Sequence, residues 1–161
     1  MKNQVHSVTF GGIGGQGVLK ASEIAGWAAM FDGYHVKKSE VHGMAQRGGS
    51  VESHLRFGKK VYSPLISAGG ADVLVCFHHE EHPRLRTFLK KGGADLTEYL
   101  DRAEAAIDNP RYINTFLVGL LSAKLPIREA AWMKAIEAVF RAEFVPENKR
   151  VFLEGRRMAQ S

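Results

Sequence analysis

A run of glycines near the N-terminus carries the first residue types in this sequence that could do chemistry. It fits the pattern G-x-G-x-x-G and contains Gly12, Gly14, Gly15, Gln16 and Gly17. Glycines let the backbone turn tightly and approach a ligand, and free N–H groups at the start of a following helix favour an anion. The segment therefore predicts a nucleotide- or anion-binding turn. The same glycines are also compatible with a turn that only packs the helix closely onto a sheet.

The residues of the next predicted strand bear on which ligand such a turn would hold. A site for NAD usually has a carboxylate at the end of the second strand, where it binds a ribose hydroxyl. Here the strand runs through Lys37 and Lys38, and the nearest acid is Glu40. Because lysines suit a phosphate better than a ribose, Lys38 is predicted to contribute to an anion site, and a plain NAD site is disfavoured.

A second glycine-rich segment, residues 39–49, has no clear period and is predicted to be a loop. A guanidinium among glycines can clamp a phosphate or a carboxylate through two hydrogen bonds, which makes Arg47 a candidate ligand-binding residue. The alternative is that Arg47 braces the loop through an ion pair with Glu40 or Glu52. The other candidates are Gly48 and Gly49 for binding, and Glu40, His42, Met44 and Gln46 for an interface or active-site loop.

Histidines at His78, His79 and His82 suggest a metal site, but their spacing does not fit one. A zinc-binding helix of the H-E-x-x-H type needs Glu directly after the first histidine, and His79 occupies that position. These residues are therefore interpreted as a solvated helix start, and no metal site is predicted. The only cysteine, Cys76, lies in an apolar run without a flanking cation and is predicted to be unreactive. No catalytic residue is predicted.

The hydrophobic pattern predicts an α/β fold that forms a single domain over residues 1–161. A strand, the glycine turn, a helix and a second strand make one βαβ unit, which indicates a Rossmann-like, mainly parallel sheet flanked by helices. From residue 95 onward the pattern is helical, which gives a helical C-terminal part. The predicted strands are 4–10, 34–36, a half-exposed strand at 50–57 and a buried strand at 71–77, and the predicted helices are 18–31, 78–89, 96–107, 111–125, 128–144 and 147–157.

Composition narrows the class of protein further. The 161 residues carry a net charge of +5, but no basic stripe interleaved with aromatic residues is present, so a nucleic-acid partner is disfavoured. No apolar run approaches the length of about 18 residues that a membrane span needs, and the first residues do not resemble a secretion signal. A single cysteine fits a reducing compartment, so a cytoplasmic location is expected.

The two glycine-rich segments together, 11–17 and 40–51, closely resemble the γ-type domain of 2-oxoacid:ferredoxin oxidoreductases. Their form is most similar to the β subunits of indolepyruvate:ferredoxin oxidoreductases, and the resemblance spans essentially the whole chain. Supporting matches are 54–58, 71–74, 109–111, Asn114 and Gly119. The family usually has another strand and a longer segment after the position of Lys91-Gly92-Gly93, so this chain resembles a shortened form.

The resemblance implies a small subunit of an enzyme that oxidatively decarboxylates a 2-oxoacid, indolepyruvate or another aryl pyruvate, to an acyl-CoA, with ferredoxin as electron acceptor. Thiamine diphosphate, Mg²⁺ and iron–sulfur clusters are then expected on a larger partner subunit, because one cysteine cannot ligate a cluster. CoA is the implied co-substrate, and the chain is not expected to be catalytic alone. The alternative is a free-standing Rossmann-like nucleotide- or anion-binding module. The identity of the 2-oxoacid, contact of CoA with this chain and the stoichiometry stay open.

Overall fold

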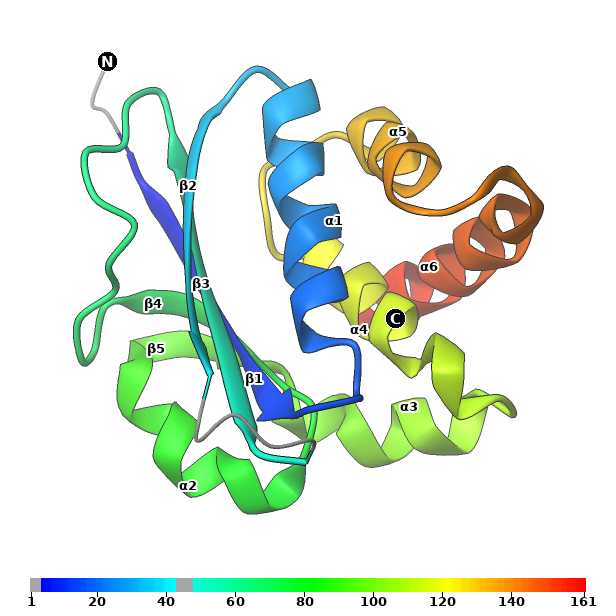
Figure 1. The fold of residues 1–161 in the computed structure, drawn as a ribbon, viewed down its shortest axis with the longest axis horizontal. Coiled ribbons are helices and arrows are strands. Elements are labelled where there is room, and N and C mark those ends of the chain that lie inside the picture. The colour runs from blue at the N-terminus through cyan, green and yellow to red at the C-terminus, as the bar shows by residue number, and fades with distance from the viewer. Residues whose placement is uncertain (1–3, 43–47) are drawn as a thin grey trace.

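The computed structural model describes residues 4–42 and 48–161, which form a five-stranded sheet with helices on both faces (Figure 1). The order across the sheet is β2-β3-β1-β4-β5. The strands are β1 (His6–Ile13), β2 (His35–His42), β3 (Ser50–Gly58), β4 (Ala71–Cys76) and β5 (Leu89–Asp95). The helices are α1 (Val18–Phe31), α2 (His82–Leu85), α3 (Leu100–Ala106), α4 (Ile113–Ser122), α5 (Glu129–Val139) and α6 (Val145–Gln160).

The sheet is mixed, and β3 is its one antiparallel member. β1 pairs in parallel with β4, and β4 with β5, whereas β3 pairs antiparallel with both β1 and β2. β1, α1 and β2 therefore make the predicted βαβ unit, but β3 is inserted between its two strands. The predicted α/β class, with flanking helices and a helical C-terminal part, is confirmed.

Four segments differ from their predicted form. The strands β1 and β2 both extend further than predicted, through Ile13 and His42, so residues 39–42 belong to a strand and not to the loop. The predicted helix at 78–89 is divided into two 3₁₀ turns with α2 between them. Residues 89–95 form β5, which the sequence does not predict because Gly92 and Gly93 have low strand propensity. Gly92 has a φ of 80°, and the pairing of β5 with β4 shifts register.

The main hydrophobic core lies between α1, the C-terminal helices and one face of the sheet. Four alanines on α1 are fully buried, which lets this helix lie close to the sheet (Ala21, Ala25, Ala28 and Ala29). The helices α4 and α6 also approach closely, because a Cβ atom on Gly119 would collide with the carbonyl oxygen of Phe152. At the start of α1, the side-chain nitrogen of Asn114 in α4 donates to the carbonyl oxygen of Gly17 at 3.5 Å.

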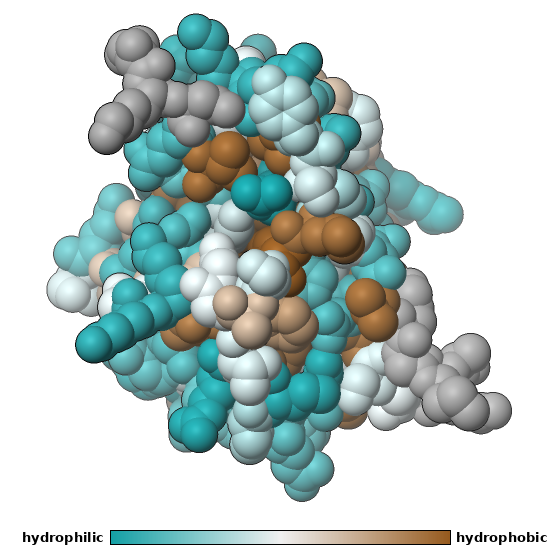
Figure 2. Space-filling model, turned by 90° about the vertical axis from the view of Figure 1, so that its left-hand side faces the viewer, coloured by the Kyte–Doolittle hydropathy of each residue, from teal (hydrophilic) through white to brown (hydrophobic). Residues whose placement is uncertain are grey.

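Hydrophobic side chains reach the surface of the molecule in several places, among them Met30 of α1 and Tyr62 and Leu65 after β3. Figure 2 views the side formed by β2 and the segment that follows β3, where hydrophobic side chains reach the surface among hydrophilic ones. Within the described residues, no helix has the length and apolar character needed to cross a membrane.

Candidate functional site

The glycine turn links β1 to α1 and is held to the sheet by the side chain of Gln16. Its amide oxygen accepts a hydrogen bond from the backbone N–H of Ile13 at 2.9 Å, and its amide nitrogen donates to the carbonyl oxygen of Phe77 at 2.9 Å. A Cβ atom on Gly12 would lie 2.7 Å from the Gln16 side-chain oxygen. Gln16 and Gly12 therefore shape the turn, with Gln16 already satisfied by backbone partners.

The last glycine of the turn sets the start of α1. Gly17 has a φ of 80°, and a Cβ atom there would lie 2.5 Å from the side-chain nitrogen of Asn114, so both conformation and space require glycine. No side chain caps this helix, and its first turn has no acidic residue. The first N–H groups of α1 are thus left for another acceptor, and the helix dipole favours a negatively charged one.

A cavity of about 500 Å³ opens at this helix start. The N-terminal part of the chain supplies Gly15, Gln16, Gly17 and Lys20, and the C-terminal part supplies Pro110, Arg111, Tyr112, Asn114, Val139, Phe140, Arg141, Phe144 and Asn148. The described lining therefore contains three cations and no carboxylate. Its size falls in the usual range for small-molecule and cofactor sites.

Aromatic rings hold two of these cations in place. The amino group of Lys20 lies 5.5 Å from the centre of the Phe140 ring, and the guanidinium carbon of Arg111 lies 5.5 Å from the centre of the Phe144 ring. Such cation–π contacts orient a charge without neutralising it. The cavity thus combines positive charge with aromatic surface, an arrangement suited to a phosphorylated ligand that also carries a planar group.

The second glycine-rich segment meets the first at Gly14. The backbone N–H of Gly14 donates to the carbonyl oxygen of Gly49 at 2.9 Å, and a Cβ atom on Gly14 would lie 3.2 Å from the backbone nitrogen of Gly48. The structure thus brings Gly48 and Gly49 to the turn. Gly48 has a φ of 93°.

The remaining candidates of that segment lie in β2 or outside the described residues. His42 is the last residue of β2 and pairs with Val51 of β3. Glu40 is exposed. Met44, Gln46 and Arg47 lie outside the described residues.

Lys38 is not brought to the cavity. It projects from β2 on the sheet face covered by α1, where its side chain packs beside Gly26 and lines a separate small hollow with Trp27 and Met30. A strand residue at this position is several residues away from the end of β2, so its side chain cannot reach the glycine turn. The phosphate-binding role suggested by its place in the sequence would need to be filled by Lys20 and Arg111.

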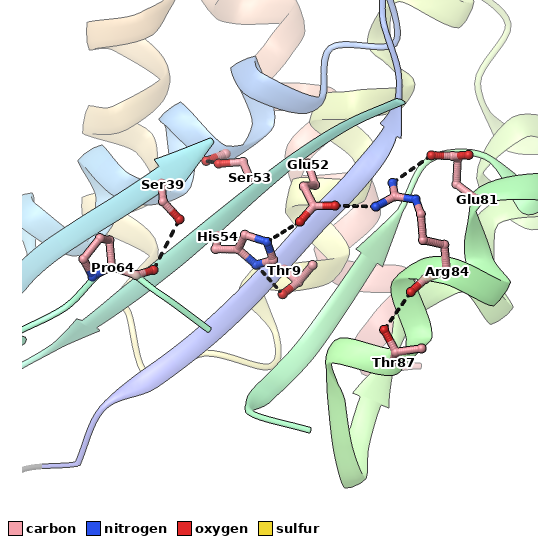
Figure 3. A network of polar contacts seen from close by, with 10 residues as sticks. Thr9, Ser39, Glu52, Ser53, His54, Pro64, Glu81, Arg84 and Thr87 are labelled. Carbon is pink, nitrogen blue, oxygen red and sulfur yellow. Dashed lines mark hydrogen bonds and ion pairs between the residues drawn. The ribbon is translucent and has the colours of Figure 1, made fainter. Parts of the chain in front are cut away.

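A buried polar network, which the sequence pattern does not predict, lies on the other face of the sheet (Figure 3). The carboxylate of Glu52 accepts a hydrogen bond from Nε2 of His54 at 2.7 Å and another from the guanidinium of Arg84. Nδ1 of His54 lies 3.0 Å from the hydroxyl of Thr9, and Arg84 also donates to Glu81 at 2.8 Å. The network joins β1 and β3 to α2.

Burial and hydrogen bonding define the charge state of this network. The side chain of Glu52 is only 10% exposed, and the hydrogen bond from His54, followed by that from Arg84, holds the pKa of its carboxyl below the ordinary value. The predicted half-exposure of Glu52 and His54 is wrong, because α2 covers this part of β3. Both oxygens of Glu52 have partners, Arg84 and His54, so the ion pair proposed between Arg47 and Glu52 would have to compete with them.

The histidines near α2 pair with different acids. Nε2 of His79 lies 2.7 Å from Asp101, and Nε2 of His82 lies 2.6 Å from Asp95. Among the described residues, no three potential metal ligands gather. The thiol of Cys76 is buried and donates to the carbonyl oxygen of His78 at 3.1 Å, and burial raises its pKa.

Sequence comparison connects these features to known proteins. A family model described as pyruvate ferredoxin/flavodoxin oxidoreductase matches residues 7–100. Indolepyruvate oxidoreductase subunit IorB from Thermococcus kodakarensis is 46% identical over 92 residues, which cover 57% of this chain and 46% of that protein. The subunit of the same name from Archaeoglobus fulgidus is 52% identical over 80 residues, which cover 50% and 39%. The chain thus spans about half the length of the curated relatives it matches.

Solved structures share the fold. The γ subunit of a keto/oxoacid ferredoxin oxidoreductase from Geobacter sulfurreducens superposes with a TM-score of 0.82 at 22% identity, over 98% of this chain and 97% of that one. Pyruvate oxidoreductase subunit PORC from Thermotoga maritima gives a TM-score of 0.76 at 22% identity, over 97% of both chains. Since the family model covers more than half of the sequence, the expected relationship is confirmed, and the chain belongs to the pyruvate ferredoxin/flavodoxin oxidoreductase family.

Proposed function

We propose that the chain is the small subunit of a 2-oxoacid:ferredoxin oxidoreductase that acts on indolepyruvate or another aryl pyruvate. The observation that carries this proposal is the match to indolepyruvate oxidoreductase subunits at 46% identity, together with family membership over residues 7–100. The proposed reaction is the oxidative decarboxylation of the 2-oxoacid to an acyl-CoA, with ferredoxin as electron acceptor.

The redox cofactors of this reaction would lie on a larger partner subunit. The chain has a single cysteine, and Cys76 is buried, engaged by a backbone carbonyl and disfavoured as a thiolate by its raised pKa. Several cysteine thiolates are needed to hold an iron–sulfur cluster. The residues of this chain therefore do not fit a cluster, and thiamine diphosphate, Mg²⁺ and clusters are assigned to the partner. The cytoplasmic location expected from this cysteine remains part of the proposal.

The contribution of this chain would be to bind and orient a phosphorylated co-substrate in the cavity at the start of α1. Lys20, Arg111 and Arg141 supply positive charge, and the uncapped N–H groups of α1 supply donors. Phe140 and Phe144 add aromatic surface for a planar group. CoA has both parts. A 2-oxoglutarate:ferredoxin oxidoreductase from Magnetococcus marinus was solved with coenzyme A bound, and 99% of this chain superposes on 32% of that chain at 17% identity and a TM-score of 0.80.

A second candidate function is a free-standing nucleotide- or anion-binding module. It is favoured by the uncapped start of α1, whose free N–H groups and helix dipole would bind an anion without a partner. The two candidates differ in whether a partner is required.

The deciding experiment is isolation of the tagged chain from its native cells under anaerobic conditions. We expect a larger, brown subunit to co-purify, and the complex to reduce a viologen dye only when given both indolepyruvate and CoA. A colourless protein that is isolated alone and binds a nucleotide by itself would overturn the subunit proposal and support the free-standing module.

The co-substrate assignment has its own test in the isolated complex. Replacing Lys20 or Arg111 by Ala should raise the KM for CoA by about tenfold or more, because a hydrogen bond to a charged group contributes about 1.5–3 kcal/mol. The KM for the 2-oxoacid should stay unchanged. Lys91→Ala, on the exposed edge strand β5, is the matched control. Equal KM values for CoA in all variants would exclude this cavity as the CoA site.

A further inference from the structure

The outer edge of β2 is an open side of the sheet. β2 is the first strand in the order β2-β3-β1-β4-β5, and no described strand pairs with its outer side. Its exposed backbone N–H and C=O groups can accept another strand, which is the usual hazard of a sheet edge and also a common basis of association.

Exposed large hydrophobic side chains lie on both sides of this edge. On one side of β2, α1 presents Trp27, Met30 and Phe31, and the first two share a small hollow with Val36 and Lys38 of β2. On the other side lies the segment after β3, in which the carbonyl oxygens of Tyr62 and Pro64 accept hydrogen bonds from β2 side chains. The exposed fractions are 80% for Tyr62, 71% for Leu65, 54% for Met30, 52% for Val41, 41% for Phe31 and 39% for Trp27.

The charges along β2 are complementary to a second copy of β2. In an antiparallel pair related by a two-fold axis, the side chains of directly opposite residues lie on the same face, so their numbers have equal parity. The axis can therefore pass through Ser39. Lys38 of each copy then lies opposite Glu40 of the other copy, which gives two equivalent ion pairs. Shifting the axis to Lys38 would instead place two lysines opposite each other. Charge thus selects the register centred on Ser39.

The two partners of this proposed ion pair are available. Lys38 and Glu40 have no ion-pair partner among the described residues. Both lie on the face covered by α1, since Lys38 packs beside Gly26 and Glu40 has the same parity. Glu40 is exposed and Lys38 is partly exposed.

The position of α1 also suits a two-fold pair. This helix packs mainly over β3, the second strand from the edge. In a pair, the two β3 strands would be three strand spacings apart, about 14 Å. Helices in direct contact lie 8–10 Å apart, so the two copies of α1 would leave a gap that large side chains can fill. Trp27 and Met30 of each copy face that gap, and each such ring or chain adds apolar area to the interface.

We propose that two copies of this chain associate through antiparallel pairing of their β2 strands about an axis at Ser39. The pair forms one continuous ten-stranded sheet, with Lys38 opposite Glu40 on both sides of the axis and with Trp27 and Met30 packed between the two α1 helices. The inference does not depend on the proposed activity. It assigns a second copy to this edge, and the larger subunit to another surface.

The first test is the mass of the purified chain in sedimentation equilibrium across a concentration series. The wild-type chain should behave as a dimer. Lys38→Glu places two glutamates opposite each other, and Glu40→Lys places two lysines opposite each other, so each should raise the dissociation constant of the dimer about tenfold or more. Lys91→Glu, a charge reversal on the opposite edge of the sheet, should leave it unchanged. Circular dichroism checks that each variant is folded.

Two combinations make the register itself testable. The double variant with Lys38→Glu and Glu40→Lys restores opposite charges and should dimerise like the wild type. A mixture of the two single variants should form a heterodimer, although each variant associates weakly alone. The proposal is overturned by a wild-type chain that stays monomeric throughout, by a dimer that the single variants do not weaken, or by protection of β2 amide hydrogens from exchange only when the larger subunit is added.

Discussion

The two faces of the sheet bury different kinds of side chain. The face covered by α1 is filled with apolar side chains from every central strand, among them Val8 and Phe10 of β1 and Leu55 of β3. The face covered by α2 has only a small apolar cluster, Leu74, Cys76 and Leu85. The polar network centred on Glu52 lies on the same face.

This difference indicates where stability and specificity reside. The α1 face gains from the removal of a large apolar area from water. The α2 face gains little from that source, and its buried carboxylate is tolerated because His54 and Arg84 satisfy it. We therefore expect the α1 face to respond to changes in volume and the α2 face to changes in charge.

The largest effect should come from a cavity on the α1 face. Phe10 is fully buried, and Phe10→Ala should lower the free energy of unfolding by about 3–5 kcal/mol. Leu74→Ala, in the small cluster on the α2 face, should cost less, about 2 kcal/mol, because few apolar neighbours surround it. Urea unfolding measures both. A larger loss from Leu74→Ala than from Phe10→Ala would remove the contrast between the faces.

A substitution that removes a charge but keeps the volume of the side chain should destabilise the α2 face. Glu52→Gln should lower the free energy of unfolding by about 1–3 kcal/mol, because the amide replaces one of the two acceptor oxygens by an NH₂ group, which then faces the donor of His54 or Arg84. Ser53→Ala is a control on the same strand, on the α1 face, where only one hydroxyl contact to Ser22 is lost. The role given to the network would be wrong if Glu52→Gln unfolded at the same urea concentration as the wild type.

The same network should make stability depend on pH. The pKa of Glu52 is lowered by folding, so its contribution is complete above its ordinary value of 4.5 and is lost as the pH falls through the lower folded value. The free energy of unfolding of the wild type should therefore fall more steeply below pH 4.5 than that of Glu52→Gln. The difference in stability between the two proteins should narrow as the pH falls. Urea unfolding at a series of pH values gives both curves. Parallel curves would show that this carboxyl has the same pKa in both states.

The smallest effect concerns the reactivity of the Cys76 thiol, which lies in the small apolar cluster on the α2 face. Cys76 is buried and its pKa is raised, so a thiol reagent should not modify the folded chain at neutral pH. One equivalent should react after unfolding in urea. The absorbance change of the reagent measures how much thiol has reacted. Rapid modification of the folded chain would contradict this prediction and would mean that α2 opens readily.

The elements that the sequence predicts well are those with a clear hydrophobic pattern. Residues 18–31 and 50–58 follow one period and form a helix and a strand, and the continuous apolar run forms the strand at 71–76. The segment 89–95 lacks such a period, and its pairing with β4 depends on tertiary contacts.

The candidate site is predicted only in part, for a physical reason. The glycine turn is a local pattern, and its contact with Gly48 and Gly49 follows from two such patterns. The opposite wall of the cavity comes from Arg111, Phe140 and Phe144. These residues are about 100 positions or more after the glycine turn and belong to no common motif, so the sequence does not connect them with it. The Glu52–His54 alternation is typical of a solvent-exposed strand face, so sequence alone could not reveal that α2 buries it.

The measurement that tests the central claim most directly is reconstitution of activity from separated subunits. The larger subunit is assayed anaerobically for viologen reduction with indolepyruvate and CoA, first alone and then with this chain added. We predict little CoA-dependent activity from the larger subunit alone, full activity on addition of the wild-type chain, and a raised KM for CoA with the Lys20→Ala chain. Full activity of the larger subunit without this chain would contradict the account.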